Sequence, residues 1–165
     1  MRKVIDLAVE NVRSERGGPF GALVVKENRV IASGVNSVAA SSDPTAHAEV
    51  AAIGAACHKL GIFQLHECEL YASREPCLMC LGAIYWARPR AFYFASSRHA
   101  AAAAGFDDGR IYDELGMAPE ARFIPGYYVV PGRSGEPFDE WARSASKVLY
   151  WSGDACLFHV RSIRR

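Results

Sequence analysis

The hydrophobic residues of this chain recur with helical spacing in some stretches and form dense, strand-like runs in others. Apolar side chains at positions 4, 5, 8, 9 and 12 share one face of a helix, which we predict to end by Gly17 and Gly18. Two runs rich in valine and isoleucine follow, at residues 20–26 and 30–34. The short polar turn between them predicts a β-hairpin.

Helical and strand patterns then alternate along the chain. The sequence predicts a helix over residues 43–60, a strand over 68–73, a helix over 77–87 and a strand over 91–95. This repeat is typical of an α/β fold in which helices cover a partly parallel, mixed central sheet. We expect one domain over residues 1–150, followed by a tail, residues 151–165, to which we assign no role.

The pattern weakens beyond residue 95. We predict a helix over residues 96–104, an edge strand over 123–130 and a late helix that begins near Pro137. One face of the late helix carries five apolar residues, Phe138, Trp141, Ala145, Val148 and Leu149.

Composition limits the classes of protein that this chain can belong to. Its 165 residues are 50% hydrophobic and 22% charged, as in an ordinary globular protein. A net charge of +1, with no basic run before residues 161–165, argues against a nucleic-acid partner. No stretch approaches the roughly 20 apolar residues of a membrane span. Because five cysteines show no disulfide framework, we expect a cytoplasmic protein.

Two short motifs supply the parts of a zinc site. His47 belongs to the sequence HAE, and Cys77 and Cys80 belong to PCLMC. We predict that Asp43 and Pro44 begin the first of the two helices that carry these ligands, and that Pro76 begins the second. A spacing of three residues places both cysteines on one helix face, where they can reach one metal ion together with the histidine.

Glu49 indicates a catalytic zinc rather than a structural one. A structural zinc is usually closed by four protein ligands, whereas a hydrolytic zinc keeps three and leaves one position to water. Cys57 is predicted to face the core, and Cys68 and Cys156 have no nearby partner in the sequence, so three ligands are the better count. A glutamate two residues beyond the histidine, followed by P-C-x-x-C, is the pattern of zinc deaminases, in which the glutamate moves protons.

Two other readings of these residues stay open. The cysteine pair at a helix start is also the arrangement of a redox protein, which would purify without zinc. A noncatalytic zinc-bearing subunit would keep the ligands, but its sequence should have lost the glutamate.

Longer stretches resemble the cytidine deaminase superfamily and, within it, the bacterial guanine deaminases. They are GGPFGA at 17–22, DPTAHAEV at 43–50, EPCLMCLGAIYWARP at 75–89 and AGFDD at 104–108. The resemblance extends to about Tyr150 and implies a three-layer α/β/α fold. It also implies hydrolytic deamination of guanine to xanthine and ammonia, with Zn²⁺ as cofactor. Deaminases of guanosine or another aminated heterocycle, and tRNA adenosine deaminases, share the zinc motifs and remain alternatives.

The resemblance also implies which residues contact a small nucleobase. Asn36 would hydrogen-bond the base, Phe20 would stack near it, and Ala48 and Trp86 would line its pocket. Asp108 would distinguish bases, because a carboxylate only accepts hydrogen bonds and guanine offers hydrogens at N1 and N2, whereas adenine has none at N1.

A homodimer is implied as well, in which Tyr150 reaches the site of the neighbouring subunit, with C-terminal exchange as one form. The tail beyond Tyr150 departs from the family pattern and bears on that role. Arg74 stands where the resemblance leads us to expect a cysteine. Since this position is not a metal ligand in the pattern, we expect the change to leave the chemistry untouched.

Overall fold

The computed structural model describes residues 1–150 of the chain. The chain divides into two compact units, Met1–Ile124 and Pro125–Arg165, which are described separately below. The predicted boundary after Tyr150 stays a prediction, because the tail lies outside the described residues.

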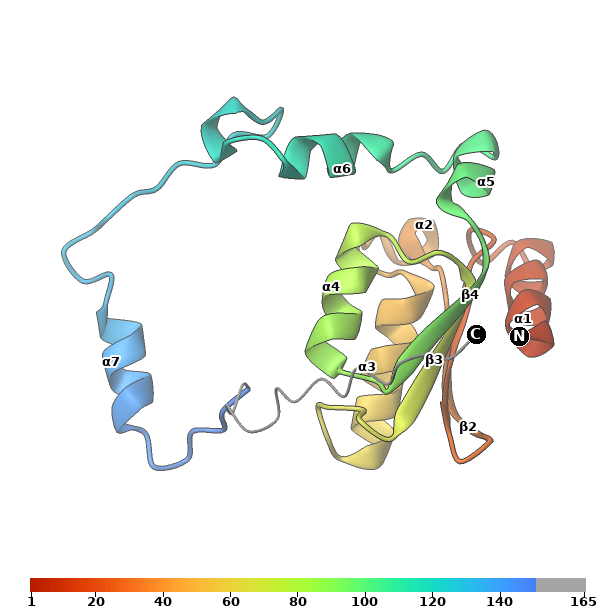
Figure 1. Cartoon of the computed structure of the whole chain (residues 1–165), viewed down its shortest axis with the longest axis horizontal. Coiled ribbons are helices and arrows are strands. Elements are labelled where there is room, and N and C mark those ends of the chain that lie inside the picture. The colour runs from red at the N-terminus through yellow and green to blue at the C-terminus, as the bar shows by residue number, and fades with distance from the viewer. Residues whose placement is uncertain (151–165) are drawn as a thin grey trace, which may run out of the picture. The chain divides into compact units, whose positions relative to one another are not determined.

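A four-stranded mixed sheet forms the centre of the first unit (Figure 1). Its strands are β1 (Gly21–Lys26), β2 (Arg29–Val35), β3 (Cys68–Arg74) and β4 (Ala91–Ser96), in the order β2-β1-β3-β4. The β1 strand pairs antiparallel with β2 and β3, whereas β3 and β4 are parallel. The predicted mixed sheet is therefore confirmed.

The predicted hairpin turn between β1 and β2 is tight. Glu27 and Asn28 both have positive φ angles, 48° and 61°, as the two central residues of a type I′ turn do.

Helices cover both faces of the sheet, which confirms the three-layer α/β/α fold. The α1 helix (Arg2–Arg13) lies on one face, and α3 (Ala48–Leu60) and α4 (Leu78–Ala87) lie on the other (Figure 1). The main core lies between the sheet and these two helices, around Val24, Leu70 and Ile84. Four short helices complete the unit: α2 (Val38–Ser41), α5 (Arg98–Ala103), α6 (Gly109–Leu115) and the 3₁₀-helix η1 (Pro119–Ala121).

Close backbone packing fixes where α3 lies. A Cβ atom added at Gly34 of β2 would stand 2.2 Å from the carbonyl oxygen of Ala48 and 2.5 Å from the nitrogen of Ala52. Only glycine leaves room for this approach. The first turn of α3 is thus held directly against the sheet.

The predicted start of the helix at Asp43 and Pro44 is wrong, because α3 begins at Ala48 with His47 as its N-cap residue. The Asp43 carboxylate accepts hydrogen bonds from the backbone nitrogen and hydroxyl of Thr45, at 2.8 and 2.7 Å. Aspartate often closes a turn in this way. This local turn competes with the helix and delays its start by one turn.

The predicted edge strand over residues 123–130 is also wrong, since this segment is irregular. Its apolar side chains are 61–90% exposed, from Val130 to Tyr128. A strand needs a partner for its backbone groups, and none of the four strands of the described sheet pairs with this segment. Pro125 within it also lacks a backbone N–H group.

The second unit contains α7 (Glu136–Arg143), with Pro137 in its first turn as predicted. The helix ends before Ala145, Val148 and Leu149, so the predicted continuous apolar face is too long. The hydroxyl of Ser144 instead accepts a hydrogen bond from the nitrogen of Ser146 at 3.3 Å, a local bond that competes with helix propagation. Across residues 1–150, no helix has both the length and the apolar character that crossing a membrane requires.

Candidate metal centre and active site

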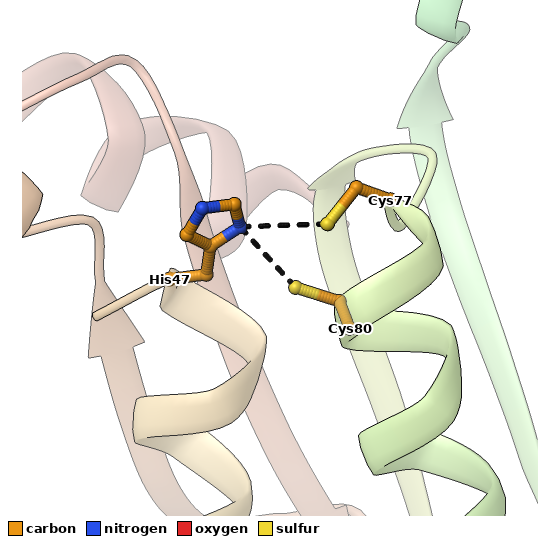
Figure 2. A group of neighbouring side chains, drawn as sticks. All are labelled: His47, Cys77 and Cys80. Atoms are coloured by element: carbon orange, nitrogen blue, oxygen red, sulfur yellow. Dashed lines mark hydrogen bonds between the residues drawn. The ribbon is translucent and has the colours of Figure 1, made fainter. Parts of the chain in front are cut away.

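Three predicted metal ligands come together between the beginnings of two neighbouring helices (Figure 2). His47 is the N-cap residue of α3, Cys77 is the N-cap residue of α4, and Cys80 lies in the first turn of α4. The Nδ1 atom of His47 is 3.5 Å from the sulfur of Cys77 and 3.4 Å from that of Cys80. Positive partial charge at both helix starts favours ionised sulfur at this place.

The spacing of these atoms suits a tetrahedral zinc ion. Zinc–sulfur bonds of about 2.3 Å and zinc–nitrogen bonds of about 2.0–2.1 Å place the two donor atoms roughly 3.5 Å apart across a tetrahedral angle. The observed separations agree with this value, and all three donor atoms lie within 4.8 Å of one another. In the described part of the chain, Cys57 and Cys68 lie outside this group. The residues present therefore fit a three-ligand zinc site.

The two thiols share their protons unequally. Hydrogen bonds from Cys80, together with one from His47, lower the pKa of Cys77 to about 4, against the opposing effect of burial. The pKa of Cys80 is raised, first by its hydrogen bond to Cys77 and then by burial. The hydrogen bond to Cys77 raises the pKa of His47. A lowered thiol pKa favours the thiolate form, which is the form that binds a metal ion.

Glu49 lies beside the ligands without belonging to their group. Its side chain is in the first turn of α3, and the residue is only 7% exposed. The Oε2 atom accepts a hydrogen bond from the sulfur of Cys80 at 3.4 Å. Burial raises the pKa of the Glu49 carboxyl. A carboxyl whose pKa is moved toward neutrality is suited to take up and release protons.

A cavity of about 670 Å³ opens at these residues. His47, Glu49 and Cys77 lie in its wall. Four of the residues predicted to contact a base also line it, namely Phe20, Asn36, Ala48 and Asp108. The structure therefore brings together candidates that lie up to 88 positions apart, from Phe20 to Asp108.

Phe20 and Asn36 hold defined positions in this wall. The ring of Phe20 meets that of Phe106 edge to face, with centroids 4.9 Å apart. The Oδ1 atom of Asn36 accepts a hydrogen bond from the backbone nitrogen of Gly18 at 3.4 Å.

Two predicted contacts are not among the residues that line the cavity. Trp86 is on α4, is 61% exposed and is not among the residues that line the cavity. Tyr150 belongs to the second unit and is 58% exposed. Their roles in substrate binding stay predictions.

Sequence reasoning did not identify Arg74 as part of the site. This last residue of β3 lines the cavity, and its Nη2 atom lies 2.9 Å from Oδ1 of Asp108. The sequence shows that Arg74 replaces the expected cysteine, but Asp108, the partner of Arg74, lies 34 positions away. Only the fold shows that the two charges meet.

Asn11 was also missed. The buried residues of α1 are Val4, Ala8 and Asn11, whereas the predicted apolar positions Ile5 and Val9 are about 40% exposed. The spacing of four and three residues from Val4 to Asn11 is the signal that identifies a buried asparagine. Its Nδ2 group donates to the carbonyl oxygens of Gly18 and Asn36, at 2.9 and 2.8 Å, and so ties together two loops of the cavity wall.

We expect Asn11→Ala to lower the free energy of unfolding by about 1–3 kcal/mol, because two partly buried carbonyl groups lose their donor. Urea unfolding of the zinc-loaded protein measures the loss. Ser14→Ala, at the C-cap of the same helix, removes a hydroxyl that donates to the carbonyl of Glu10 at an exposed site and should change stability by less than about 0.5 kcal/mol. Equal losses in the two variants would contradict the bracing role of Asn11.

Comparison with known proteins gives one consistent picture. The sequence model of one protein family, the cytidine and deoxycytidylate deaminase zinc-binding region, matches residues 1–96. The chain is similar to guanine deaminase from Bacillus subtilis, with 51% identity over 150 residues, which cover 91% of this chain and 96% of that protein. A solved structure of Bacillus subtilis guanine deaminase, 51% identical, matches with a TM-score of 0.89 over the same shares of the two chains.

Similarity to a tRNA-specific adenosine deaminase from Aquifex aeolicus is shorter. It amounts to 45% identity over 78 residues, or 47% of this chain and 52% of that protein. The region matched by the family model contains His47, Glu49 and both cysteines. The fold, the ligand geometry and these matches together show that the chain belongs to the cytidine and deoxycytidylate deaminase family of zinc-dependent hydrolytic enzymes.

Proposed function

We propose that this protein hydrolyses guanine to xanthine and ammonia. The observation that carries the proposal is the three-ligand group beside a buried carboxylate, set in a cavity whose wall also holds Asp108. The extended similarity to the Bacillus subtilis enzyme supports guanine as the base.

His47, Cys77 and Cys80 would hold the zinc ion. When bound, zinc supplies the Lewis acidity that makes water a nucleophile near neutral pH. Glu49 takes a proton from the attacking water as oxygen adds to the amino-bearing C2 carbon of guanine. The same carboxyl gives this proton to the neighbouring ring nitrogen, then takes the second proton from the added hydroxyl group and gives it to the departing amine, so that ammonia leaves and the oxygen stays in xanthine.

Asp108 provides the selection for guanine. Its carboxylate accepts hydrogen bonds from N1–H and from the amino group, whereas adenine presents an acceptor at N1 and would face the carboxylate unpaired. We assign Phe20 and Ala48 to the walls around the ring, Asn36 to a hydrogen bond with the base and Trp86 to the pocket rim.

Deamination of adenosine in tRNA is the second candidate, since the similarity to the Aquifex protein includes the zinc motifs. A tRNA substrate needs a basic surface, and this chain has a net charge of only +1. A free base, which carries no phosphate, suits this charge better.

Ammonia release over a panel of guanine, guanosine, adenine, cytosine and tRNA tests the proposal. We expect turnover of guanine, with xanthine as the product identified by chromatography. Turnover of guanosine but not guanine would overturn the choice of base, and inosine in tRNA would support the second candidate.

We also propose a homodimer in the cytoplasm, with Tyr150 of each chain contributing to the neighbouring site. The free thiols of Cys57 and Cys68 suit a reducing compartment. Light scattering coupled to size exclusion should give twice the 18.0 kDa mass of the chain. A mass of one chain at micromolar concentration would contradict the dimer.

A further inference from the structure

Arg74 and Asp108 form a charged pair inside the wall of the cavity. Arg74 ends β3 and Asp108 immediately precedes α6, so the pair joins the end of β3 to the segment that follows its parallel neighbour β4. The side chains are only 11% and 16% exposed, and Nη2 of Arg74 lies 2.9 Å from Oδ1 of Asp108. Both residues line the same cavity as Glu49.

The pair is not satisfied by protein atoms alone. Within residues 1–150, the buried Nε of Arg74 and the buried Oδ2 of Asp108 have no hydrogen-bond partner. An unpartnered buried polar atom is costly, and more so on a charged group. The pair therefore keeps donor capacity on the guanidinium next to acceptor capacity on the carboxylate.

A neighbouring donor and acceptor of this kind match one edge of guanine. Guanine presents a donor at N1 beside an acceptor at O6, and arginine is the side chain most often found on guanine O6. Adenine presents the reverse order, an acceptor at N1 beside a donor at N6. A carboxylate that accepts and a guanidinium that donates complement guanine and oppose adenine.

We propose that Arg74 is a specificity-determining residue, which donates a hydrogen bond to the oxygen at C6 of the purine while Asp108 accepts from N1–H. This inference rests on the proposed function and extends recognition of the base from Asp108 alone to Asp108 and Arg74. The opposite charges of the pair also balance each other, so the pair favours a neutral base over a phosphate-bearing nucleotide.

The alternative is a purely structural ion pair that fixes the start of α6. Such a pair would stabilise the fold and shape the cavity for every ligand alike. A role in recognition instead changes the preference between two ligands that differ at C6.

The test compares the binding of hypoxanthine, which has the C6 oxygen and N1–H, with the binding of purine, which has neither. Titration calorimetry on the zinc-loaded protein should show hypoxanthine binding at least about 10-fold more tightly than purine, as expected for a well-placed arginine contact. Arg74→Met should reduce this ratio at least about 3-fold while leaving the zinc content unchanged, and the contact of Asp108 with N1–H accounts for the preference that remains.

Arg90→Met is the matched control. Arg90 also pairs with a carboxylate, Glu69, at 2.6 Å, but the pair lies outside the cavity wall. The control should keep the parental ratio. Should Arg74→Met fail to fold, Arg74→Lys keeps the charge beside Asp108 but lacks the planar fork, and we expect it to lower the preference as well.

A parental protein without preference for hypoxanthine would overturn the proposal. Variants of Arg74 that bind hypoxanthine and purine more weakly by the same factor would also overturn it, because a structural ion pair has this effect. Because binding is measured without turnover, failure of guanine deamination in the ammonia assay counts against the proposed function separately.

Discussion

Replacement of Glu49 by glutamine will lower ammonia release from guanine by about 10²–10⁴-fold, the usual contribution of a positioned proton-transfer group. Glutamine keeps the shape of the side chain but cannot take a proton from water at neutral pH. Because Glu49 lies outside the three-ligand group, the variant should still bind zinc stoichiometrically. Steady-state kinetics and metal analysis on the same preparation give both quantities.

Glu67→Gln is the matched control for this prediction. Glu67 is 76% exposed at its side chain and pairs with Lys26 on the surface, so its loss should leave turnover unchanged. Parental activity in Glu49→Gln would show that another group moves the protons. Loss of zinc from that variant would show instead that Glu49 acts as a ligand.

Replacement of Cys77 by alanine will remove the metal as well as the activity. Two donors remain, His47 and Cys80, and a zinc ion needs at least three protein ligands to be held in a site of this kind. We expect zinc well below one ion per chain by atomic emission, and no measurable xanthine.

Cys57→Ala controls for the loss of a thiol. Cys57 is a half-buried residue of α3 that packs at the margin of the core and is not in the ligand group. This variant should keep zinc and turnover. A full zinc content in Cys77→Ala would contradict the three-ligand site, and a reversible disulfide between Cys77 and Cys80 in zinc-free parental protein would favour a redox role.

The elements that carry the site could be predicted from sequence because their signals are local. Periodicity identified α3, α4 and the strands, and the motif spacing identified all three ligands and Glu49. Errors arose where a local bond or a missing partner outweighs periodicity. The turn closed by Asp43 delayed α3, and the apolar run after Phe123 found no strand to pair with.

The contacts that complete the site depend on tertiary structure. Asn11 braces loops that lie 7 and 25 residues away, and Arg74 meets Asp108 across 34 residues. No short pattern encodes such pairings. The sequence shows only that Arg74 replaces the expected cysteine. The role that we propose for it in base recognition depends on its contact with Asp108 in the folded chain.

Because β3 and β4 are parallel, the segments that follow them begin at the same edge of the sheet, and one carries metal ligands while the other carries a residue for base recognition. Ligands of open α/β sheets gather beyond the carboxyl ends of the strands. The segment after β3 carries the cysteines, whereas the segment after β4 carries Asp108. Substitution of Asp108 in the loop after β4 can therefore change the contact with the base without moving the cysteines, whereas Arg74, the last residue of β3, ties recognition of the base to the strand that leads to them.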